Sequence, residues 1–170
     1  MKKLFAVICM LLCSTAAFAL DSDDSIVHWK SIVGVITIPG VDNPVAGIRA
    51  GATPWTVRNG HASVNLATGA TFFAVEGLSI NGGNSTGTPG PISAVVGTLV
   101  CNAGATNQAI LDTPSVALNA HGNAAFGGFI QNIPSSCSNP LFLIRIAVPA
   151  GAAGRWIATA TERFIGDDGL

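Results

Sequence analysis

The chain has 170 residues, of which only 10% are charged, with 8 Lys and Arg against 9 Asp and Glu. This charge content excludes a disordered polyelectrolyte, and the cations are too few for a protein that binds nucleic acid by neutralising phosphates. The length fits one domain.

The first 19 residues have the three parts of an export signal. Lys2 and Lys3 make the start cationic, residues 4–13 are an unbroken apolar run, and Ala17-Phe18-Ala19 fits the small-residue cleavage pattern. A membrane-spanning helix needs about 20 apolar residues, so we expect no transmembrane anchor after cleavage. Cleavage after Ala19 would leave a periplasmic or extracellular chain of 151 residues with a formal charge of −3.

The mature part is predicted to hold an acidic lead-in at residues 20–30, one domain at residues 31–165 and a tail at residues 166–170. Within the domain, apolar and β-branched runs are separated by Gly, Pro and Asn turn signals, a pattern typical of strands. Asn59-Gly60 is the strongest hairpin signal, because both residues tolerate the positive φ of a type I′ turn. We predict strands at residues 31–38, 54–58, 61–66, 70–80, 92–100, 141–148 and 155–165, and shorter strand candidates at residues 108–113, 115–119 and 124–130.

The strand pattern indicates an all-β fold. No segment of the mature chain keeps a 3.6-residue period for three turns, whereas short strands recur every 8–12 residues or so, as in sandwiches. We therefore expect an antiparallel two-sheet β-sandwich of eight or nine strands, with low surface charge because Ser, Thr, Asn and Gly cover its outer faces.

Cys101 and Cys137 are the only cysteines that remain after cleavage. Two cysteines in an exported chain most often form a disulfide, and a loop of this length gives a stabilisation of about 4 kcal/mol. A redox or metal role is disfavoured, because the chain has no C-x-x-C motif and no histidine within four residues of either cysteine.

One stretch carries a family resemblance. Residues 60–78, GHASVNLATGATFFAVEGL, resemble the G-x-A-x-V-x-L strand, Thr-Gly turn and V-x-G-L strand of CHRD-type domains, and Gly90-Pro91-Ile92 resembles their later G-P-[VI] strand. The A-H-I-H segment usual in that family is absent, and Pro54-Trp55 with the two cysteines looks more like small secreted bacterial proteins of unknown function. The resemblance implies an extracellular β-sandwich without known catalysis.

Residues 81–91, NGGNSTGTPGP, read as a long surface loop and a candidate binding site. Trp55 and Trp156 are either core anchors or an aromatic ligand platform, and their alternating apolar flanks favour the core. The candidate contact residues of the loop are Asn81, Asn84, Ser85, Thr86 and Thr88.

Chemistry-bearing residues do not converge in the sequence. Ser85 lies in a G-x-S-x-G match, and Asp112 and His121 follow in the order of α/β-hydrolases, but the strand-turn-helix context of that motif is missing. The histidines show no metal-ligand spacing, so we expect no metal and no cofactor. Glu76 and Arg145 interrupt apolar strands, and the sequence leaves open whether they pair or point outward.

These features predict a secreted, non-catalytic binding module for a protein or carbohydrate outside the cell. The first alternative is a structural subunit that forms homo-oligomers through strand edges. The second is a small serine hydrolase using Ser85, Asp112 and His121.

Overall fold

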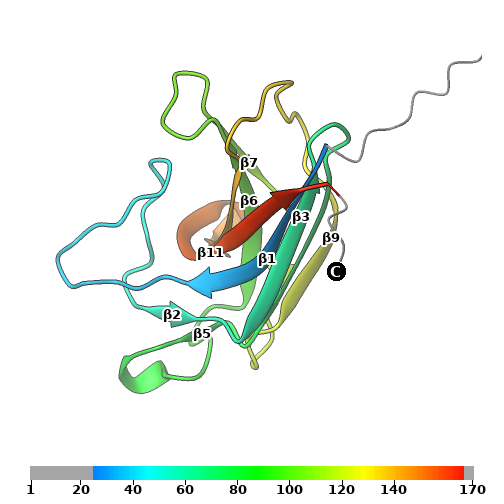
Figure 1. Cartoon of the computed structure of the whole chain (residues 1–170). Coiled ribbons are helices and arrows are strands. Elements are labelled where there is room, and N and C mark those ends of the chain that lie inside the picture. Colours follow the sequence, from blue (N-terminus) through cyan, green and yellow to red (C-terminus); the bar gives the residue numbers. More distant parts are fainter. Residues whose placement is uncertain (1–24, 167–170) are drawn as a thin grey trace, which may run out of the picture.

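A computed structural model describes residues 25–166, whose regular elements are strands and three-residue 3-10 helices (Figure 1). The predicted all-β class is confirmed. The strands are β1 (Ile26–Gly34), β2 (Trp55–Thr56), β3 (Asn59–Asn65), β4 (Ala70–Glu76), β5 (Ser79–Ile80), β6 (Ala94–Cys101), β7 (Ala109–Asp112), β8 (Val116–Ala117), β9 (Ala124–Phe129), β10 (Leu141–Ala147) and β11 (Ala153–Ile165).

Nine of these strands form one antiparallel sheet. Its order is β7-β6-β10-β11-β1-β3-β4-β9, with β8 also paired to β6, while β2 and β5 form a separate two-strand sheet. The large sheet curls, so that β8 and β9 come into contact near its two ends. The expected sandwich of two sheets is not confirmed, because the hydrogen-bonded path from β7 to β9 is unbroken.

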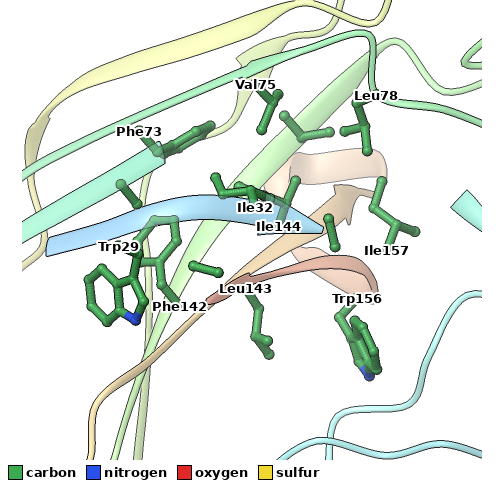
Figure 2. Close-up of a cluster of buried hydrophobic side chains, with 14 of the residues drawn as sticks. Trp29, Ile32, Phe73, Val75, Leu78, Phe142, Leu143, Ile144, Trp156 and Ile157 are labelled. Carbon is green, nitrogen blue, oxygen red and sulfur yellow. The ribbon is translucent and has the colours of Figure 1, made fainter. Parts of the chain in front are cut away.

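The concave side of the curled sheet encloses the core. Phe73 of β4 and Phe142 of β10 are fully buried and lie with ring centroids 5.8 Å apart. Trp29 of β1 packs on Phe142 at 5.6 Å, and Figure 2 shows these rings among aliphatic side chains from β1, β10 and β11. Burial of this apolar surface is the main favourable term in the fold.

The disulfide Cys101–Cys137 is confirmed. Cys101 ends β6 and Cys137 lies in the loop before β10, with their Cα atoms 4.7 Å apart. Beside it, Asn102 Nδ2 donates to the carbonyl of Ser136 and Asn102 Oδ1 accepts from the backbone N–H of Ser138. The loop is therefore attached to the end of β6 by both covalent and polar contacts.

The predicted hairpin at Asn59-Gly60 is wrong. Both residues lie inside β3, where they face Glu76 and Val75 of β4. A Cβ at Gly60 would lie 2.9 Å from Cβ of Ile32, so glycine allows close packing against β1 here rather than a turn.

The first strand also differs from its predicted bounds. β1 begins at Ile26 rather than residue 31 and ends at Gly34, so it takes in part of the expected lead-in, while Ile36 and Ile38 lie in the following loop. The predicted export signal (residues 1–19), residues 20–24 and residues 167–170 lie outside the described part of the chain. Between residues 25 and 166, no helix is long and apolar enough to cross a membrane.

Candidate functional site

The outward side of strands β11, β1, β3, β4 and β9 carries a row of rings and small residues. In the cross-strand register, His28 faces Phe164 on one side and Ser63 on the other, Ser63 faces Phe72, and Phe72 faces Gly127. Successive side chains in a strand point to opposite faces. Because both sequence neighbours of His28, Ser63 and Phe72 are buried, these three side chains point to the outer face, and Phe164 and Gly127 lie beside them in the register. We call these five residues the outer row.

The rings on this face form two stacked pairs. His28 stacks on Phe164 with centroids 5.0 Å apart and planes 13° from parallel, and His61 of β3 stacks on Phe72 at 5.4 Å and 28°. The Nζ of Lys30 lies 4.8 Å from the centroid of Phe164, within cation–π range. Such cross-strand pairs stabilise the sheet and hold the rings in defined positions.

Two shallow grooves follow the outer row. The first, of about 330 Å³, is lined by His28, Lys30, His61, Ser63 and Phe164, so it lies between the two stacked pairs. The second is lined by His28 and Ser63 again and continues across β4 to β9. Since they share two residues, the grooves adjoin each other, and together they make up one surface region across five strands, a span of about 19 Å at the usual strand spacing. We call it the ring groove.

The charge of the ring groove is positive. Lys30 lines it, and no Asp or Glu does. The ion pairs found between residues 25 and 166 involve other cations, namely Arg49, Arg58 and Arg145. Glu162 of β11 does not line the groove, and its carboxylate accepts a hydrogen bond from Ser31.

At β9 the second groove is lined by a pair of glycines, Gly127 and Gly128, which carry no side chains. Gly127 faces Phe72, and a Cβ there would lie 3.9 Å from Cδ2 of that ring. Phe129, at the end of β9, is 58% exposed, and Phe72 is 41% exposed. The second groove is therefore lined by two exposed phenylalanine rings, Phe72 of β4 and Phe129 of the last strand in the sheet order.

The predicted binding loop lies elsewhere. Residues 81–91 follow β5 of the small sheet, at the lower left of Figure 1, and contribute no residue to the ring groove. Its hydroxyls bond within the loop, since Thr86 Oγ1 donates to the carbonyl of Gly83 at 2.8 Å and Thr88 Oγ1 donates to that of Ser85 at 3.0 Å. Asn81 and Asn84 are exposed.

The hydrolase residues are not joined by hydrogen bonds in the described chain. Asp112 Oδ1 accepts from Thr98 Oγ1 at 2.6 Å and from an Arg145 Nη at 3.2 Å. His121 lies in a turn, where its backbone N–H donates to Asn119. Ser85 ends a three-residue 3-10 helix rather than leading into an α-helix.

Trp55 and Trp156 belong to the core. Each is 4% exposed, and Trp156 Nε1 donates to the carbonyl of Asn43 at 3.1 Å. Trp29 is equally buried, so the tryptophans supply no ligand platform. The exposed rings are histidines and phenylalanines, and one signal for them was present: in a strand, the neighbours Phe72 and Phe73 must point to opposite faces.

Glu76 and Arg145 do not pair with each other. Glu76 is exposed beside Arg58, 3.5 Å away. Arg145, whose side chain is 11% exposed, donates to the carbonyls of Gly154 at 2.7 Å and Ala153 at 2.6 Å and contacts Asp112. Because register shifts in the β10–β11 pairing occur at Arg145, its guanidinium satisfies carbonyls that the irregular ladder leaves open.

Among residues 25–166, no group of three or more His, Cys, Asp or Glu side chains is placed to hold a metal ion. No family model, curated protein or solved structure matches this chain. The ring groove is therefore characterised by its own geometry: two stacked ring pairs, the hydroxyl of Ser63 and the cation of Lys30.

Proposed function

We propose that this protein is an exported, non-catalytic binding module whose ring groove holds a carbohydrate chain. The observation that carries the proposal is the two His–Phe stacks on the outer face of the sheet, beside two adjoining grooves. Ligand sites combine apolar and aromatic walls with a few polar groups that orient the ligand. A sugar ring matches this mixture, because its C–H face is apolar and its hydroxyls project from the edge.

Three properties of the groove suit an extended polymer. It crosses five strands, so several sugar rings would lie along it. Its rings are held by stacking before any ligand arrives, which lowers the ordering cost of binding. Ser63, His28 and His61 supply polar groups along the floor and walls, within reach of sugar hydroxyls.

Export is part of the proposal. The cationic, apolar and small-residue pattern of residues 1–19 and the partial CHRD-like strand pattern both favour a secreted protein. The disulfide is compatible with an oxidising compartment. A two-layer sandwich is the finer fold proposal, supported by Gly97 of β6 lying against Phe73 of β4 across the core.

Binding of the mature protein to a panel of soluble polysaccharides, measured by affinity electrophoresis and calorimetry, tests the proposal. Phe72→Ala and His28→Ala are expected to weaken binding at least tenfold, because each removes one ring of a stack. His121→Ala is the matched control. His121 is an exposed histidine in a turn and does not line the ring groove, so this variant is expected to bind like the wild type. The proposal fails when no polysaccharide binds, or when the ring variants bind as well as the control.

A structural subunit that assembles through strand edges is the second candidate. β9 ends the strand order of the large sheet and pairs only with β4. Its sequence, AAFGGF, contains no charge or proline, and such edges are templates for pairing with another chain. Light scattering at rising protein concentration tests this candidate, and a monomer at every concentration would refute it.

A further inference from the structure

The loop between β1 and β2 exposes a cluster of aliphatic side chains. Ile36 is 81% exposed, Ile38 64% and Val41 60%, although Val35 just before them is buried. In Figure 1 this blue-to-cyan segment projects away from the sheet. Monomeric soluble proteins rarely leave contiguous apolar surface exposed unless it serves an interaction. We call these three residues the apolar tip.

The apolar tip is presented by a loop that is tied down at its base. The backbone N–H of Val41 donates to the carbonyl of Ile38 at 3.1 Å across the Pro39-Gly40 turn, where Gly40 has a φ of 79°. Asp42 and Arg49 form an ion pair at 2.9 Å. These contacts fix the short turn that carries Ile38 and Val41, and Ile36 lies two residues before that turn in the chain.

Further contacts connect the base of the loop to the core. Trp156 of β11 donates its indole N–H to Asn43, and Gly51 donates its backbone N–H to the carbonyl of Trp156 at 2.8 Å. Val45 and Ile48 exchange backbone hydrogen bonds. The tip is thus carried by a rigid support and need not be ordered when it meets its partner.

The size of the apolar tip decides the kind of partner. A stable protein–protein interface buries roughly 800 Å² on each side, and three aliphatic side chains fall well short of that. A lipid bilayer takes in single side chains without a matching surface, and affinity then grows with the apolar area inserted and with charge attraction.

Charge at the base of the loop favours an anionic bilayer. The hollow behind the tip is lined by Arg49, Arg155 and Asp42, with no second carboxylate among its lining residues. Since Asp42 pairs with Arg49, Arg155 leaves this region with a net positive charge. Basic groups beside inserted apolar residues are attracted to anionic headgroups.

We propose that Ile36, Ile38 and Val41 insert into the surface of a lipid bilayer that contains anionic headgroups, with Arg155 next to the lipid phosphates. The site is separate from the ring groove and does not depend on carbohydrate binding. Lipid attachment through the loop leaves β3, β4 and β9 free for the ligand proposed above.

Co-sedimentation of the full mature protein with vesicles tests this proposal. One set of vesicles is phosphatidylcholine alone, and the other is an equal mixture of phosphatidylcholine and phosphatidylglycerol. We expect the protein to pellet with the mixed vesicles, less so as salt is raised. The Ile36→Asn/Ile38→Asn double variant should lower the partition coefficient at least tenfold, whereas Ile110→Asn, on exposed β7, should leave it unchanged.

Four results would overturn the proposal. The first is wild-type protein that stays in the supernatant with both kinds of vesicle. The second is a double variant that pellets like the wild type, and the third is equal partition onto both vesicles, which would contradict the assignment to anionic headgroups. The fourth is a concentration-dependent dimer that the double variant abolishes, which would assign the apolar tip to a second copy of the chain. Unchanged far-ultraviolet circular dichroism of both variants controls for folding, because all the substituted side chains are exposed.

Discussion

Gly97 in the middle of β6 lies against two buried phenylalanine rings. A Cβ added there would lie 2.7 and 2.8 Å from two ring carbons of Phe73 and 2.8 Å from Cζ of Phe142. Carbon atoms normally approach to about 3.5–4.0 Å, so Gly97→Ala would force both rings or the strand to shift. Neither ring has free space, because Phe73 stacks on Phe126 at 5.9 Å and Phe142 packs on Trp29 at 5.6 Å.

Overpacking of this kind costs about 1–3 kcal/mol of unfolding free energy. For a chain of this length, each kcal/mol lowers the Tm by about 2–4 °C, so the Tm of Gly97→Ala should fall by about 2–12 °C. Gly127→Ala is the matched control, since its new Cβ meets its nearest atom at 3.9 Å. This exposed strand substitution should stay within about 0.5 kcal/mol of the wild type.

Urea unfolding of the oxidised protein, followed by circular dichroism, measures the difference. A second comparison adds Phe142→Leu to the Gly97→Ala background. There Phe142→Leu should cost less unfolding free energy than it costs in the wild type, because the smaller side chain makes room for the new methyl group. The reasoning is refuted if Gly97→Ala and Gly127→Ala lose the same free energy, or if the Phe142→Leu effect is identical in both backgrounds.

Three further predictions concern stability and assembly. Cys101→Ser/Cys137→Ser should lower the unfolding free energy by about 4 kcal/mol, and reduced wild-type protein should unfold at the same urea concentration as the variant; an unchanged midpoint would contradict a stabilising disulfide. Arg145→Leu should cost about 1–3 kcal/mol, because it leaves the carbonyls of Ala153 and Gly154 without their side-chain donor; a loss below that of an exposed Arg58→Leu would refute a structural role. Phe129→Lys, which adds a charge at the free β9 edge, should abolish any self-association seen by light scattering, and persistence of the oligomer would place its contact elsewhere.

Local sequence patterns determined which parts of this chain are strands. Alternation in residues 61–66 puts Ala62 and Val64 on one strand face and His61 on the other, and the structure buries the first two and exposes His61. Continuous apolar runs predicted β6 and β10 within two residues of their ends. These predictions succeed because side-chain alternation depends only on the strand itself.

Patterns that depend on a distant partner were misread. Asn-Gly is a turn signal in isolation, but Gly60 is placed in a strand by the close approach of Ile32 from β1. Ile36 and Ile38 continue a β-branched run, yet they lie outside the sheet. The pairing with β11 ends at Val35, whose N–H donates to the carbonyl of Ile157, and the chain then turns away. Neither outcome can be read from neighbouring residues.

The sequence alone predicted an all-β chain and a disulfide between its last two cysteines, and both are confirmed. The export-type leader stays a prediction from local composition. Only the tertiary structure assembled the ring groove. β1 lies between β11 and β3, so that residues from opposite ends of the chain, His28 and Phe164, become stacked neighbours. The low charge of the chain thus coexists with a surface of histidine and phenylalanine rings. The position of the ring groove was decided by long-range strand register, which core packing sets and local propensity does not.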